Sequence, residues 1–159
     1  MKSFATMLAA AMCLAGAADA CPSWANDGQR ASFSGSELRG GGKALRVVAG
    51  GDQRLIGCGI PFGSDNGDGY VTRDPDFTFD MRGLSGYKLV LSTYSECDSV
   101  LVINTGTDSW FYDDDDNSDS ALDSRIILTR PRDGIYDVWI GTHDGSVCDA
   151  MLALQTIPR

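Results

Sequence analysis

The stretch that decides the fold is YKLVLSTYSECDSVLVIN, residues 87–104. Residues 87–91 alternate, with Tyr, Leu and Leu on one face of an extended chain, which is the two-residue period of a β-strand. Residues 100–103 are apolar at every position, which is typical of a central strand with both faces buried. Residues 104–108, NTGTD, then supply the turn chemistry of a hairpin loop. The stretch predicts consecutive strands of an all-β protein.

The same pattern extends in both directions along the chain. Further short apolar or alternating runs are separated by Gly, Asp, Asn and Pro, and they recur at spacings of about ten residues, as in sandwiches and jelly rolls. Residues 35–42 are rich in glycine, and we expect them to form a mobile surface loop. We therefore predict a jelly-roll-like antiparallel β-sandwich. Its strands are expected to include residues 44–48, 77–81, 126–128, 136–140 and 151–154.

The first twenty residues are typical of a secretory signal peptide. A positively charged start is followed by an apolar run over residues 4–18 and by an A-x-A cleavage site at 18–20. A spanning helix needs about 20 apolar residues, and no stretch reaches that length, so we expect no membrane span. Lipidation of Cys21, which directly follows the cut, is the alternative interpretation. Cleavage leaves residues 21–159, the usual size of one domain, exported to the periplasm or the extracellular space.

Four cysteines remain after this cleavage. An even number in an oxidising compartment predicts two disulfides, for which three connectivities exist. We favour Cys21–Cys58 and Cys97–Cys148, because each bond then closes a loop within its own half of the chain. No two of these cysteines have the short spacing of zinc ligands, so a metal-thiolate site is not expected.

The balance of charge restricts the class of partner. The formal net charge is −9 at pH 7. Nucleic acids and anionic membrane surfaces both require a basic footprint on the protein, so we expect neither as a partner. An acidic chain is compatible with a cation as ligand.

The second half of the chain has a distinctive order of features: a strand, an aromatic residue, an acidic turn, a strand, and a late strand that begins with Gly-x-Tyr. They lie at residues 97–104, Trp110, 112–117, 124–126 and 133–142. Over residues 87–157 this order resembles the bacterial pre-peptidase C-terminal domain, a jelly-roll β-sandwich often appended to secreted peptidases, here without a peptidase sequence before it. The first half looks like small stand-alone exported proteins of proteobacteria. The resemblance implies a substrate-binding or secretion-related role, and the calcium binding that some related modules show.

The acidic loop in this region is the sharpest candidate site. It places six carboxylates within residues 113–123. Ca²⁺ takes six to eight oxygen ligands, so the loop has enough donors, although its spacing does not match an EF-hand. The alternative is a solvated loop in which one or two aspartates hold Asx-turns. A second acidic loop, residues 64–69, fits calcium less well. The candidate calcium ligands are Asp113, Asp114, Asp115, Asp116, Asn117, Asp119 and Asp123.

Signals for catalysis are weak. His143 is the only histidine and lies in a turn, and the chain has no nucleophile motif of the Gly-x-Ser-x-Gly kind. The only glutamates, Glu37 and Glu96, fall in a glycine-rich segment and beside a cysteine, which are poor places for a fixed acid–base pair. Four paired cysteines leave no thiol nucleophile. We expect no catalytic residues.

Aromatic residues offer a second candidate site. Trp110 and Tyr112 adjoin the acidic loop and could form a platform for a sugar or peptide, although core packing is the commoner role of such residues. Tyr136 and Trp139 are three apart in a strand, so they fall on opposite faces, one expected in the core and the other outward.

The sequence thus predicts an exported, non-catalytic binding or accessory module that is stabilised by calcium and recognises a protein or glycan partner. The alternatives are a secreted, peptidase-associated hydrolase and a structural envelope protein.

Overall fold

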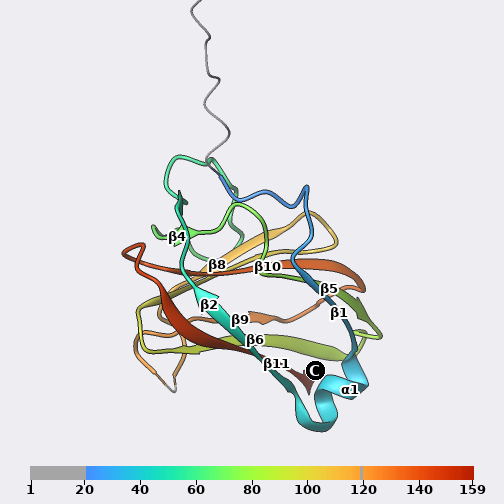
Figure 1. The fold of residues 1–159 in the computed structure, drawn as a ribbon. Helices are drawn as coiled ribbons and strands as arrows, with labels where there is room; N and C mark the ends of the chain where they lie inside the picture. Colours follow the sequence, from blue (N-terminus) through green and yellow to red (C-terminus); the bar gives the residue numbers. More distant parts are fainter. Residues whose placement is uncertain (1–20, 119) are drawn as a thin grey trace, which may run out of the picture.

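The structure, a computed structural model, describes residues 21–118 and 120–159. The predicted signal peptide and Asp119 lie outside the described residues. The described residues form two β-sheets packed face to face, with one short helix beside them (Figure 1). One sheet contains β1 (Gln29–Ser34), β3 (Gln53–Arg54), β4 (Tyr70–Val71), β5 (Phe77–Arg82), β7 (Ser99–Asn104), β8 (Trp110–Asp113) and β10 (Gly134–Thr142). The other contains β2 (Lys43–Ala49), β6 (Tyr87–Ser95), β9 (Arg125–Leu128) and β11 (Cys148–Pro158).

The chain crosses repeatedly between the sheets. In the larger sheet, β10 is central and pairs with β5, β4 and β7, while β8 pairs with β7. The smaller sheet has the order β2-β11-β6-β9. This arrangement confirms the predicted disulfide-linked all-β sandwich. One pairing differs from the expected antiparallel pattern, because β1 runs parallel to β5.

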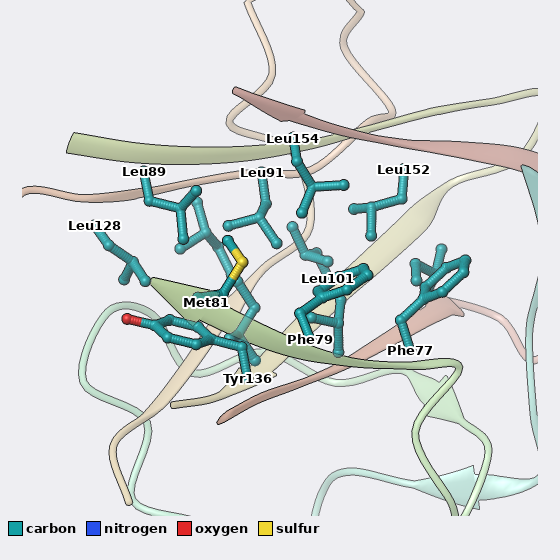
Figure 2. Packing of buried hydrophobic residues seen from close by; sticks show 14 of the residues in the cluster. Phe77, Phe79, Met81, Leu89, Leu91, Leu101, Leu128, Tyr136, Leu152 and Leu154 are labelled. Carbon is teal, nitrogen blue, oxygen red and sulfur yellow. The ribbon is translucent and has the colours of Figure 1, made fainter. Parts of the chain in front are cut away.

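The main core lies between the two sheets (Figure 2). The two-residue period of β5 directs Phe77, Phe79 and Met81 inward, and each is at most 2% exposed. Leucines from β6 and β11 face them across the sandwich, as Leu91 and Leu154 do in Figure 2. Burying one such side chain stabilises the folded state by about 1.5–3 kcal/mol. The alternating apolar residues predicted from the sequence are therefore the ones that hold the two sheets together.

A second core covers the outer face of the larger sheet. Val100 and Val102 of β7 point away from the main core and pack with the fully buried Trp139. Leu55 and Val71, from the segment that includes β3 and β4, and Tyr112 of β8 also belong to this cluster. β7 is thus buried on both faces, as its unbroken apolar run predicted.

Tyr136 and Trp139 lie in different clusters, so their placement on opposite faces of β10 is confirmed. The expectation that one of them points outward is wrong, because Tyr136 is only 2% exposed and Trp139 is fully buried. The physical reason is the second core, which covers the face on which Trp139 stands.

The expectation of a mobile loop at residues 35–42 is also wrong, because the segment contains α1 (Gly35–Gly41). The hydroxyl of Ser34 accepts a hydrogen bond from the backbone N–H of Glu37 at 3.2 Å, which caps the first turn. Leu38 is buried in the main core. Gly42, with φ of 63°, ends the helix by donating its N–H to the carbonyl of Leu38. The cap and one buried leucine outweigh the low helix propensity of glycine.

Both predicted disulfides are present. Cys21–Cys58 joins residues 37 apart in sequence, and Cys97–Cys148 joins residues 51 apart. Loops of this length correspond to about 3–4 kcal/mol of stabilisation per bond in the chain-entropy description. Within the described ranges, no helix is long and apolar enough to cross a membrane.

Candidate functional site

A groove opens where the edge of one sheet meets the edge of the other. Among the named strands of the described residues, β8 pairs with β7 alone and β9 with β6 alone, so each is the last named strand of its sheet on this side of the sandwich. Two cavities, of about 290 and 410 Å³, lie along the seam and share Phe111 and Ile127. We call them together the β8–β9 groove, with a basic end at Arg130 and Arg132 and an acidic end at Asp113.

The basic end has an apolar floor and a polar rim. The floor consists of Phe111, Ile127, Leu128, Pro131 and Tyr136. The rim consists of Thr105, Thr107, Ser109, Thr129, Arg130 and Arg132. Contacts of both kinds in one cavity are typical of ligand sites, where apolar surface supplies affinity and a few polar groups supply orientation.

The hairpin loop between β7 and β8 positions three of the rim hydroxyls. The carbonyl of Thr105 accepts the N–H of Asp108, and the N–H of Thr105 donates to the carbonyl of Ser109, both at 2.9 Å. Asp108 takes φ of 55°, a conformation that Asp tolerates better than most residues. The hydroxyls of Thr105 and Thr107 lie 3.1 Å apart. The predicted hairpin is confirmed, and its residues line the basic end.

The ionisable side chains that line the basic end are two arginines and one tyrosine. The Tyr136 hydroxyl donates to the carbonyl of Arg132 at 2.6 Å, and burial raises the pKa of Tyr136 above its usual value. No aspartate, glutamate, histidine, cysteine or lysine lines this cavity.

The acidic end is built on residues of the predicted calcium loop. One carboxylate oxygen of Asp113 accepts the N–H of Arg125 at 2.6 Å and the N–H of Asp116 at 3.2 Å. Burial raises the pKa of Asp113 to about 6. The side-chain amide of Asn117 donates to the carbonyl of Thr93 at 2.9 Å. These contacts hold the start of the loop against β9 and its middle against β6.

The other predicted loop residues take different roles. Asp123 is buried and accepts the hydroxyl of Ser95 at 2.8 Å. Asp114 accepts the Tyr112 hydroxyl at 3.1 Å, and burial raises the pKa of Asp114. Asp115 and Asp116 are exposed.

The geometry does not fit a ready-made calcium site. Across the described residues, no three His, Cys, Asp or Glu side chains come close enough to hold a metal ion. The carboxylates of Asp113 and Asp123 are directed at backbone and hydroxyl groups of the protein itself. Asp68, in the second acidic loop, pairs with Arg54. Calcium binding by the loop at residues 113–123 stays a prediction.

The aromatic pair does not form an open platform. Tyr112 is fully buried, and its hydroxyl donates to the carbonyl of Asp68 at 2.6 Å. Trp110 is half-buried and stacks on Trp139, with ring centroids 5.3 Å apart. The ring of Tyr112 packs against Phe62. Both residues serve mainly to cover the outer face of the larger sheet.

The weak catalytic candidates stand in separate elements. His143 is exposed in the β10–β11 turn. Glu37 lies in α1 and pairs with Lys43 at 3.2 Å. Glu96 is exposed and lines a depression of about 390 Å³ together with Arg46 and Asp149. These residues form no common site.

Sequence reasoning missed the basic end of the groove. Arg130 and Arg132 flank a proline in a chain of net charge −9, and this local pair of positive charges is the signal that could have identified them. The sequence of residues 105–109 indicates a turn but not a binding site. The position of these hydroxyls opposite the arginines depends on strand pairing, which the sequence does not show.

Comparisons with known proteins leave the function open: no family model matches the chain, and neither the curated proteins nor the solved structures contain a match.

Proposed function

We propose that this protein is an exported, non-catalytic binding module that holds part of a protein or glycan partner in the basic end of the β8–β9 groove. One observation carries the proposal. The cavity combines an apolar floor, hydroxyl donors and two arginines, and its lining contains no Asp, Glu, His, Cys or Lys that could act as an acid or a base.

The dimensions of the cavity suit a small part of a larger partner. About 290 Å³ is at the lower limit of pockets that enclose whole small molecules. The cavity accommodates one sugar ring or one or two amino-acid side chains. Its walls come from paired strands and a hydrogen-bonded hairpin, so little ordering is required on binding.

The proposal includes export of the protein from the cytoplasm. It is supported by the signal-peptide pattern of residues 1–20 and by the two disulfides, which persist in oxidising compartments. A peptidase-associated hydrolase would need a general base beside a nucleophile, and the lining of the basic end contains hydroxyls but no Asp, Glu, His or Lys to activate them.

A binding screen tests the proposal. The oxidised protein, residues 21–159, is applied to arrays of peptides and glycans, alongside two matched variants. Ser109→Trp fills the mouth of the cavity, whereas Ser36→Trp places the same side chain on exposed α1. We expect a set of ligands that the wild type and Ser36→Trp retain and that Ser109→Trp loses. If every retained ligand also binds Ser109→Trp, the groove is not the binding site.

A further inference from the structure

The outer edge of β9 has backbone groups available for pairing. The N–H of Thr93 donates to the carbonyl of Ser124, so Ser124 and, by the two-residue period, Ile126 and Leu128 face β6. Arg125 and Ile127 therefore face outward. The N–H of Arg125 is taken by Asp113 at 2.6 Å, whereas the backbone of Ile127 has no partner on that side among the described residues.

The opposite wall of the groove is already closed. β8 is covered by residues 62–64: the N–H of Gly63 donates to the carbonyl of Trp110 at 2.7 Å. The hydroxyl of Ser64 donates to the carbonyl of Tyr112 at 2.6 Å and accepts its N–H at 2.9 Å. An added strand in the groove can therefore extend the smaller sheet at β9 and cannot extend the larger sheet at β8.

β9 has only part of the usual protection of an edge strand. It is short and contains the charged Arg125, but residues 125–128 contain neither Lys nor Pro, which commonly block such edges. The Ile127 side chain is 49% exposed at the point where the two cavities meet. An apolar side chain of an incoming strand would pack there against Ile127 and Phe111.

The positive charge of the basic end determines which side chains an incoming strand needs. Neither Arg130 nor Arg132 forms an ion pair with any described residue, and Arg159 lines a neighbouring cavity together with both of them. The acid that follows Arg132 in the sequence, Asp133, accepts the N–H groups of Gly83 and Leu84, at 2.8 and 2.9 Å. These hydrogen bonds lower the pKa of Asp133, which lines the neighbouring cavity and not the basic end. The basic end is thus a locally positive cavity on an acidic protein.

We infer that the groove binds an extended acidic segment of another polypeptide, which adds as a strand to the free edge of β9. Main-chain hydrogen bonds to Ile127 supply affinity, as in other cases of strand addition, and alternate side chains supply specificity. One apolar side chain packs on Phe111 and Ile127. An Asp or Glu two positions away, on the same face of the segment, pairs with Arg130 or Arg132. This inference rests on the proposed function and names the class of partner.

Selection from a library tests it. A displayed library of random octapeptides is selected on the oxidised protein, in parallel with Arg130→Gln/Arg132→Gln and with the control Arg39→Gln/Arg46→Gln, which removes the same charge from exposed positions. We expect wild type and control to enrich peptides with an apolar residue two positions from an acid. The Arg130/Arg132 variant is expected to bind the enriched peptides about tenfold more weakly. Enrichment without acids, failure to enrich any peptide, or equal affinity in both variants would overturn the inference.

Two further probes separate strand addition from other modes of binding. A selected peptide with alternate amides N-methylated keeps its side chains but cannot pair with β9, and we expect it not to bind. Binding as strong as that of the parent peptide would rule out strand addition. Tetragalacturonate is the second probe, an acidic glycan. If it binds the wild type but not Ser109→Trp, and no peptide does so, the partner is a glycan. The proposed function then stands and the inference fails. If no probe is sensitive to Ser109→Trp, both fail.

Discussion

The carboxylate of Asp76 allows a quantitative test of how this sandwich is stabilised. It lies at the start of β5 and accepts the N–H of Ile140, in central β10, at 2.7 Å. Desolvation by burial outweighs this hydrogen bond and raises the pKa of Asp76 from 3.8 to about 6. A difference of this size corresponds to about 3 kcal/mol of folding free energy lost at pH 8, where the carboxylate is charged in both states.

The substitution Asp76→Asn removes the charge and keeps an oxygen that can accept the Ile140 N–H. We expect it to stabilise the protein at pH 8 by about 2–3 kcal/mol. As the pH falls through about 6, the folded wild type takes up a proton while the unfolded chain does not until about 3.8. The wild type therefore gains stability relative to the variant, and the difference falls below about 1 kcal/mol at pH 4.

Urea unfolding of the oxidised protein at pH 8 and pH 4 measures both values. Asp149→Asn, at an exposed position of β11, is the control for a general change in net charge. A destabilising effect of Asp76→Asn at pH 8, or a stabilisation that does not depend on pH, would refute the assignment of a desolvated charge at this position.

Four further predictions concern the rest of the fold. Leu101→Ala, at a fully buried position of β7, should cost about 2–5 kcal/mol in urea unfolding, and a cost below 1 kcal/mol would contradict close packing there. Ser34→Ala should cost about 1 kcal/mol through loss of the helix cap, whereas an unchanged midpoint would mean that α1 does not depend on it. Replacing Cys97 and Cys148 together by serine should cost about 3–4 kcal/mol, measured against the oxidised wild type; no loss would show that this loop needs no crosslink. Calcium binding by the acidic loop requires a rise in Tm in millimolar CaCl₂ over EDTA that Asp114→Asn reduces, and equal midpoints would exclude it.

Much of the fold could be read from the sequence because strand patterning is local. The alternation in β5 and β6 and the unbroken apolar run of β7 each determine which faces of a strand are buried. The residues that cover the outer face of β7 come from distant parts of the sequence, so a local pattern does not predict them. The burial of Trp139 depends on Leu55 and Val71, which come from a segment distant in sequence and show no strong strand pattern of their own.

The helix was missed for a different reason. Glycines at residues 35 and 40–42 suggested a loop, and their low helix propensity is real. The competing signal was Ser34 followed three residues later by Glu37, the pattern of a capping box, with Leu38 next. In a helix of two turns, a cap and one buried side chain are enough to decide the conformation.

The candidate site was the least predictable part. The acidic loop stood out in composition, but Asp113 and Asp123 hold the loop itself. The basic end of the groove joins a hairpin loop at residues 105–109 to residues 130–132, which follow a strand of the other sheet. These two segments come together only because the edges of the two sheets meet, and no spacing in the sequence predicts that meeting.

The most direct test of the central claim is amide chemical-shift mapping by NMR with a selected acidic peptide as the probe. The groove account predicts that the perturbed amides are confined to residues 105–111 and 125–132, with the largest change at Ile127. Perturbations centred on the exposed face of the smaller sheet, around Arg46 and Met151, would contradict it and place the binding surface elsewhere.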